Sequence, residues 1–172
     1  MDTNALKFGS LFVTCFIMAA CSGVTDAPNQ VESPPPADIP KPGKKLAMAP
    51  ERAWESENCD LRPLPHLRLE RSELTAPTVN RGNSIIYRFA YAACVPPQPG
   101  YILGRFRTTI SLAGKPLSTR SDDTFPVETG TWIVGTDVAV PKDAEPGVYS
   151  LEGTLAAKGA TIQDRMNFTV QP

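Results

Sequence analysis

Residues 85–91 of the chain have the sequence IIYRFAY. Apolar side chains recur at every second position, which places Ile85, Tyr87, Phe89 and Tyr91 on one face of a β-strand and Arg88 on the other. The same period of two recurs in five further segments, at residues 67–69, 105–112, 132–140, 149–155 and 162–170. No stretch between them shows a helical period, so the pattern predicts an all-β fold.

Turn-forming residues separate these predicted strands. They are the segments NRGN at 80–83, AGKP at 113–116 and KG at 158–159. Such segments are typical of hairpins and sheet corners. Six or seven short strands with one apolar face each need a second sheet to cover that face, so we expect an antiparallel β-sandwich.

A segment late in the chain carries a resemblance to a known fold family. Residues 141–149, PKDAEPGVY, resemble the tyrosine corner that opens the penultimate strand of many immunoglobulin-like domains. The resemblance implies an immunoglobulin-like sandwich, with the Tyr149 hydroxyl bonded to nearby backbone. We place this domain at residues 54–172. The resemblance implies nothing about function.

The N-terminus has the pattern of an export signal. Lys7 precedes an apolar run of about a dozen residues, which is too short to span a bilayer core of about 30 Å as a helix. The run ends in MAAC at 18–21, which resembles the lipobox of bacterial lipoproteins. The resemblance implies that residues 1–20 are a signal peptide and that Cys21 receives lipid. It also implies outer-membrane sorting, since Ser22 replaces the aspartate that retains lipoproteins in the inner membrane. The alternative is an ordinary cleaved signal.

Residues 21–53 are predicted to be a disordered, proline-rich linker between the lipid and the domain. The stretch from 22 to 50 has no aromatic residue and few bulky apolar ones, so it cannot bury enough surface to fold. Its proline clusters favour extended polyproline geometry. A spacer is the preferred interpretation, and a proline-motif ligand for a partner domain is the alternative.

Two cysteines remain in the predicted domain after the signal and the lipidation site are set aside. An exported compartment is oxidising, so Cys59 and Cys94 are expected to form a structural disulfide that ties the start of the domain to the sheet. Catalytic dithiols usually have a C-x-x-C spacing, which is absent from this sequence.

Composition and motifs exclude most catalytic and cofactor chemistry. The 172 residues carry a formal net charge of −1, without the basic excess of a nucleic-acid binder. His66 is the single histidine, which removes most zinc sites and every histidine-based triad. Asp122 and Asp123, expected in a loop, match no calcium-site spacing with Asp137 or Asp143. We therefore expect a protein that is not an enzyme and has no metal, no catalytic residue and no cofactor.

Two features are candidates for a partner-binding surface. Arg88, Arg105 and Arg107 fall on outward strand faces, and they would form a basic stripe if their strands paired. Alternatively, they protect exposed sheet faces from edge pairing. The second feature is the loop VPPQPGY at 95–101, in which Pro97 and Tyr101 could present a rigid contact; it could equally be an inert connection.

Three functional hypotheses follow from the sequence. The first is a non-catalytic outer-membrane lipoprotein, facing the periplasm, whose domain is an interaction or assembly module of an envelope protein complex, as in secretion-system or pilus accessory lipoproteins. The second is a periplasmic or surface binding protein or inhibitor for a glycan or protein ligand. The third is an enzyme or metal carrier, which the absence of motifs disfavours.

Overall fold

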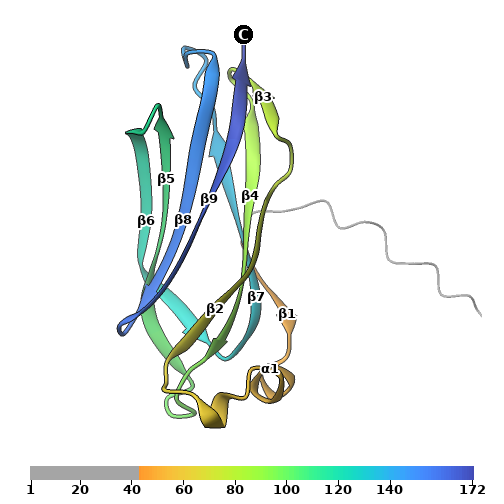
Figure 1. Ribbon diagram of the computed structural model, residues 1–172, viewed down its shortest axis with the longest axis vertical. Coiled ribbons are helices and arrows are strands. Elements are labelled where there is room, and N and C mark those ends of the chain that lie inside the picture. Colours follow the sequence, from red (N-terminus) through yellow and green to blue (C-terminus); the bar gives the residue numbers. More distant parts are fainter. Residues whose placement is uncertain (1–42) are drawn as a thin grey trace, which may run out of the picture. The chain divides into compact units, whose positions relative to one another are not determined.

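The computed structural model describes residues 43–172, in which nine strands form two sheets (Figure 1). The first sheet has the order β1-β7-β4-β2, with bounds β1 (Gly43–Met48), β7 (Gly130–Ala139), β4 (Ser84–Cys94) and β2 (His66–Leu74). The second has the order β3-β9-β8-β5-β6, with bounds β3 (Thr78–Asn80), β9 (Ala160–Gln171), β8 (Gly147–Ala157), β5 (Tyr101–Leu112) and β6 (Lys115–Glu128). All neighbours are antiparallel except β3 and β9.

The predicted all-β sandwich is confirmed. The six alternating segments of the sequence form β2, β4, β5, β7, β8 and β9. Two of the predicted turns are tight hairpins with left-handed φ at both positions: Ala113 and Gly114 join β5 to β6, and Lys158 and Gly159 join β8 to β9. The twist of such turns matches that of the strands they join, so they fix the register of both pairs.

The strand order is that of an immunoglobulin-like domain. With β2, β4 and β7 as strands A, B and E, and β5, β6, β8 and β9 as C, C′, F and G, each strand has its expected neighbour. The tyrosine corner is also confirmed, since the Tyr149 hydroxyl on β8 donates a hydrogen bond of 2.7 Å to the Glu145 carbonyl oxygen.

Strand β1 departs from this family plan. In constant-type immunoglobulin domains strand D lies beside strand E, but here only Thr129 lies between the end of β6 and the start of β7. The chain crosses from one sheet to the other at this residue, leaving no length for a D strand. The N-terminal strand β1 takes the place beside β7 instead. Gly130 follows the crossing with φ +141°, and a Cβ there would press on Leu46 and Trp132.

Three strands and one helix were not predicted from the sequence. They are β1, β3, β6 and α1 (Pro50–Ser56), which is followed by the 3-10 turn η1 (Cys59–Leu61). Because β1 pairs with β7, the folded domain includes residues 43–53, and the predicted linker boundary before Trp54 is too late. The predicted signal peptide, Cys21 and residues 21–42 of the predicted linker lie outside the described residues. Within residues 43–172, no helix is long and apolar enough to cross a membrane.

Aromatic rings bridge the two sheets in the core. Phe89 on β4 contacts Phe106 on β5 edge-on at 5.5 Å between centroids, and Phe106 lies 5.5 Å from Phe125 on β6. Tyr87 reaches from β4 to the opposite sheet and lies against Gly153 of β8, where any Cβ would overlap its phenol. Glycine at this position therefore sets how closely the sheets approach at their centre.

Two buried tyrosines differ in how their hydroxyls are satisfied, which gives a paired test of the fold. Tyr149 donates to the Glu145 carbonyl, whereas the buried Tyr91 hydroxyl has no hydrogen-bond partner among the described residues. We expect Tyr149→Phe to lower the free energy of unfolding by about 1 kcal/mol and Tyr91→Phe to leave it unchanged or raise it. Urea denaturation of both variants measures this, and an equal loss in both would contradict the assigned corner.

Candidate functional site

An apolar groove lies at the end of the sandwich that carries α1. We call it the Trp groove; its volume is about 530 Å³, and its lining residues are Leu46, Pro50, Glu51, Trp54, Pro97, Gly100, Glu128, Thr129 and Trp132. They come from β1, α1, the β4–β5 loop, the β6–β7 crossing and β7. Five parts of the chain thus converge on one concave surface with two indoles, and aromatic side chains are enriched in binding sites.

Exposed apolar side chains extend this surface onto β5. Leu46 is 42% exposed, Tyr101 47% and Leu103 58%, although all three are large and apolar. Tyr101 lies opposite Glu128 in the β5–β6 register. Of the two loop residues predicted to contact a partner, Pro97 lines the Trp groove and Tyr101 lies outside its lining, on the neighbouring strand.

A disulfide and an ion pair hold the segment that carries Trp54. The predicted Cys59–Cys94 disulfide is confirmed, with a Cα–Cα distance of 5.7 Å, and it joins η1 to the end of β4. Closing a loop of this size contributes about 3–4 kcal/mol in the chain-entropy model. Beside it, Arg68 of β2 donates two hydrogen bonds to the buried Glu57 carboxylate, from Nε at 2.8 Å and from Nη2 at 2.5 Å. Arg62 donates to the Glu57 carbonyl oxygen at 2.7 Å.

The surroundings lower the pKa values of two groups in this region, Glu57 and His66. The hydrogen bond from Arg68 holds the pKa of Glu57 below its usual value, against the opposing effect of burial. Burial lowers the pKa of His66, and the nearby Arg62 adds to this effect. The Nε2 atom of His66 is buried and has no hydrogen-bond partner in residues 43–172. The lowered pKa favours the neutral form of His66, which lies beside the Glu57–Arg68 pair.

Lys44 of β1 connects the two sheets at the rim of the groove. Its ammonium group donates to the Glu128 carboxylate at 2.7 Å and to the Pro126 carbonyl at 2.8 Å, both on β6. It also lies 3.9 Å from the centroid of the Trp132 ring. A cation over an indole face is attracted by the ring quadrupole. The contact between Lys44 and Trp132 therefore links β1 to β7 through side chains.

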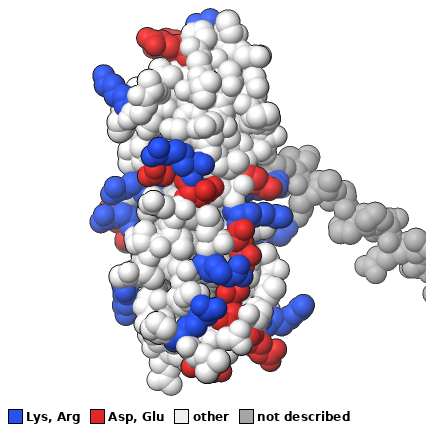
Figure 2. Space-filling view, in the orientation of Figure 1, with Lys and Arg blue, Asp and Glu red and all other residues white. Residues whose placement is uncertain are grey.

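The predicted basic stripe does not form. Arg88 lies on β4, whereas Arg105 and Arg107 lie on β5, and these strands belong to different sheets. Arg88 pairs with Glu73, and Arg105 pairs with Asp123. Figure 2 shows basic and acidic side chains mostly as neighbours on the face in view, rather than in separate patches. The prediction was wrong because consecutive strands in the sequence need not pair in a sandwich.

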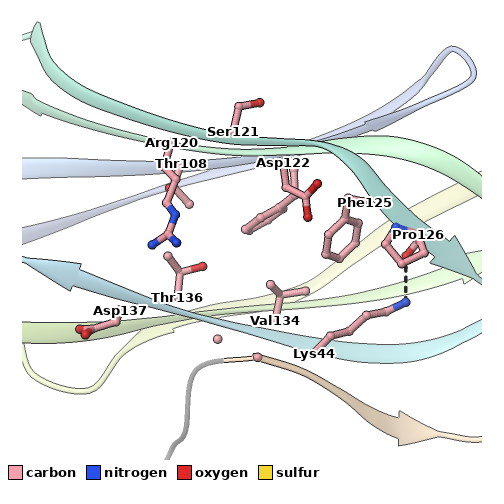
Figure 3. A pocket seen from close by; sticks show the side chains of 13 residues that line it. Lys44, Thr108, Arg120, Ser121, Asp122, Phe125, Pro126, Val134, Thr136 and Asp137 are labelled. Atoms are coloured by element: carbon pink, nitrogen blue, oxygen red, sulfur yellow. Dashed lines mark hydrogen bonds between the residues drawn. The ribbon is translucent and has the colours of Figure 1, made fainter.

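A second concavity, the inter-sheet cleft, lies between β6 and β7 and has a volume of about 580 Å³. Its lining residues are Gly43, Lys44, Phe106, Thr108, Arg120, Ser121, Asp122, Phe125, Pro126, Val134, Gly135, Thr136 and Asp137. Figure 3 shows the Arg120 guanidinium reaching from β6 toward Thr136 on β7. Among the described residues, the Arg120 side chain has no hydrogen-bond or ion-pair partner, although its backbone lies opposite Thr108 in the β5–β6 ladder.

The two aspartates of β6 are separated by the strand itself. Asp122 and Asp123 were predicted in a loop, but they lie within a strand, where consecutive side chains point to opposite faces. Asp122 lines the inter-sheet cleft and accepts hydrogen bonds from Thr124, whereas Asp123 pairs with Arg105. In the described part of the chain, no three His, Cys, Asp or Glu side chains are grouped as a metal site would require.

Sequence reasoning missed Trp54 and Leu46 of the Trp groove and Arg120 of the inter-sheet cleft. One signal in the sequence could have pointed to Trp54. Pro50 followed by Glu51 is typical of the first turn of a helix, and α1 is the element that brings Trp54 to the groove. Nothing in the sequence around Arg120 distinguishes it from other arginines on exposed strands.

Comparisons with known proteins assign no family. No family model matches the chain, and no curated protein matches it. Among solved structures, the chain is similar to an alkylpurine DNA glycosylase from Pseudomonas fluorescens, with 10% identity, 62% of this chain and 30% of that chain covered, and a TM-score of 0.43. It is similar to a β-glucosidase from Erythrobacter marinus (9% identity, 62% and 16% covered, TM-score 0.45).

A third similar structure is the CARDB domain of the PF1109 protein from Pyrococcus furiosus. The identity is 10%, with 62% of this chain and 89% of that chain covered and a TM-score of 0.42. The chain spans less than a third of the length of the glycosylase and of the glucosidase. The immunoglobulin-like assignment rests on the strand order and tyrosine corner of this chain itself.

The Glu57–Arg68 pair gives a pH-dependent test of how the groove segment is held. Because the folded-state pKa of Glu57 is lowered, its stabilising effect is complete above its ordinary pKa of 4.5 and is lost as pH falls through the folded-state value. At pH 7 we expect Glu57→Gln to lower the free energy of unfolding by about 1–2 kcal/mol, since Arg68 is partly screened by water. The difference from wild type should shrink in denaturation curves below pH 4.5; a constant difference would contradict the charged pair.

Proposed function

We propose that this protein is a non-catalytic outer-membrane lipoprotein, anchored through Cys21 and facing the periplasm. Its immunoglobulin-like domain acts as a protein-interaction or assembly module of an envelope complex. The membrane is contacted through the N-terminal lipid, and neither a nucleic acid nor a small-molecule cofactor takes part. The observation that carries the interaction role is the Trp groove, in which Trp54, Trp132 and Leu46 form an apolar surface on the outside of a well-packed sandwich.

The rigidity of the groove supports this role. Its helix is held by the Cys59–Cys94 disulfide and by the Glu57–Arg68 pair, and its indole Trp132 donates to the Glu128 carbonyl at 3.1 Å. A preformed apolar surface loses little conformational entropy when a partner binds, so more of the burial energy contributes to affinity. Aromatic side chains in such positions are the commonest energetic centres of protein interfaces.

The second candidate function is that of a periplasmic or surface binding protein or inhibitor for a glycan or protein ligand. The observation that favours it is the inter-sheet cleft, where the polar side chains of Arg120, Thr108 and Thr136 lie among apolar lining residues. The two functions differ in their need for the lipid. An assembly module requires the anchor to meet its partner, whereas a soluble ligand would be captured equally well without it.

The anchor has a direct test. Cells that express the full chain and are fed a palmitate analogue should label it, and the Cys21→Ala form should lose the label, since acyl chains are added to this cysteine in lipoproteins. The wild-type chain should fractionate with the outer membrane. Cys15→Ala is the control, because it removes a cysteine of the predicted signal peptide and leaves both the proposed lipidation site and the Cys59–Cys94 disulfide in place. Label retained by Cys21→Ala would contradict lipidation at this residue.

The interaction role is tested by affinity capture from crosslinked cells with the full-length chain, followed by mass spectrometry. We expect one envelope complex to be recovered with wild type and to be lost with Leu46→Glu, which places a charge in the Trp groove. Val148→Glu is the matched control, because Val148 is an exposed aliphatic residue (62%) outside the groove. The proposal fails if no specific complex is recovered, or if Leu46→Glu and Val148→Glu behave alike.

A further inference from the structure

Most polar groups that line the Trp groove are occupied by contacts within the domain. The Glu128 carboxylate accepts a hydrogen bond from Lys44 at 2.7 Å, and the Trp132 indole donates to the Glu128 carbonyl oxygen at 3.1 Å. The Thr129 hydroxyl accepts from the Val95 amide at 3.1 Å and lies 3.5 Å from the Val95 carbonyl oxygen. These three lining residues therefore have little hydrogen-bonding capacity left for a ligand.

Two polar groups of the groove have no such contact. Within residues 43–172, neither the Glu51 carboxylate nor the Trp54 indole N–H has a hydrogen-bond or ion-pair partner. They occupy positions i and i+3 of α1, so they are neighbours on the surface of the helix. A ligand that matches this groove therefore carries an acceptor for the indole, a cation for the carboxylate and an apolar surface for the remaining lining.

A proline-rich segment has the backbone that these groups require. In polyproline II geometry the chain has no internal hydrogen bonds, so its carbonyl oxygens are free to accept from the Trp54 indole. Proline has no backbone N–H, and a buried N–H without a partner would be costly against apolar walls. A helix uses most of its carbonyl oxygens in its own hydrogen bonds, and an added strand needs a sheet edge. Neither would use the free indole donor.

The charge of the groove defines what accompanies the prolines. Both ionisable lining residues, Glu51 and Glu128, are acidic, and the described lining has no lysine or arginine. Lys44 lies outside the lining, 3.9 Å from the centroid of the Trp132 ring, so one face of this indole already has its cation. The exposed Glu51 carboxylate is therefore the place for a basic side chain of the ligand.

The apolar surface beside the groove favours an extended ligand. Tyr101 lies opposite Glu128 in the β5–β6 register, and Leu103 lies opposite Pro126. Cross-strand neighbours point to the same face of a sheet, so the exposed side chains of Tyr101 and Leu103 continue from the rim of the groove along β5. An extended segment of about 3.1 Å per residue can contact both the groove and this strip.

We propose that the Trp groove binds a proline-rich segment of a partner protein in which a lysine or arginine flanks the prolines. This inference deepens the proposed function and rests on it, since it names the chemistry of the partner. Aromatic-lined grooves bind such segments because the extended conformation is largely formed before binding, so little conformational entropy is lost.

The two tryptophans of the chain give a direct signal for the experiment. Trp54 and Trp132 are its only tryptophans, and both line the groove, so tryptophan emission reports on this surface. The probe is a peptide of sequence PPLPPKPP, titrated into the full-length chain purified in detergent. We expect a saturable change in emission and, with a fluorescein label on the peptide, in anisotropy. The peptide SSLSSKSS, which keeps the charge and lacks the prolines, should not bind.

Charge reversal at the groove gives the decisive comparison. Glu51→Lys should weaken binding about tenfold or more, since it replaces an attractive charge pair by repulsion. A peptide with glutamate in place of lysine should recover the loss. Glu145→Lys is the matched control, because it makes the same change of charge at an exposed glutamate outside the groove. Trp54→Phe keeps an aromatic ring but removes the indole donor, and it should weaken binding about fivefold.

Several outcomes would overturn the inference. They are absence of binding, equal binding of PPLPPKPP and SSLSSKSS, and equal effects of Glu51→Lys and Glu145→Lys. Saturable binding of an oligomer of N-acetylglucosamine in place of the peptide would assign the groove to a glycan. Binding that appears only after Pro34, Pro35 and Pro36 are replaced by serine would mean that the chain's own proline-rich stretch occupies the groove, which also overturns the inference.

The same measurements separate this inference from the proposed function. If an envelope complex is captured and is lost with Leu46→Glu while the peptide fails to bind, the inference is wrong and the proposed function stands. If no complex is captured at all, the proposed function fails, whatever the peptide does.

Discussion

The crossing from β6 to β7 is the constraint on which the architecture depends. Glu128 is the last residue of one sheet and Gly130 is in the other, so Thr129 alone connects them. Its hydroxyl accepts a hydrogen bond from the Val95 amide at 3.1 Å, which fixes the crossing against the end of β4. Because so short a connection cannot contain a strand, the edge of β7 is left without its usual neighbour, and a strand from the N-terminal side of the domain fills part of that place.

This arrangement makes β1 a part of the fold and not merely the end of a tether. Lys44 bonds to two groups of β6 while its backbone pairs with Val134 of β7, so one residue links the edges of both sheets. Such a contact closes one end of the inter-sheet cleft, as Figure 3 shows for the bond to Pro126.

The fold was largely predictable, because strands that are buried on one face carry an alternating pattern of apolar and polar residues. Residues 85–91 and 105–112 show it, and the tyrosine corner fixed the immunoglobulin-like plan. Strand β6 was not predicted, because most of its residues are exposed on both faces of the strand. Apolar and polar residues alternate only at its end, where Phe125 and Val127 are buried. The arginine stripe was wrong for a related reason: alternation assigns a residue to a face of its strand but does not determine which strands become neighbours.

The two concave surfaces of the domain are physically coupled, since β1 and β7 border both. Leu46, toward the end of β1, lines the Trp groove, and Gly43 and Lys44, at its start, line the inter-sheet cleft. Trp132 and Thr136 likewise lie on the same strand, and their spacing is fixed by the continuous ladder with β4. A displacement of β1 would therefore change the shape of the Trp groove and of the inter-sheet cleft together.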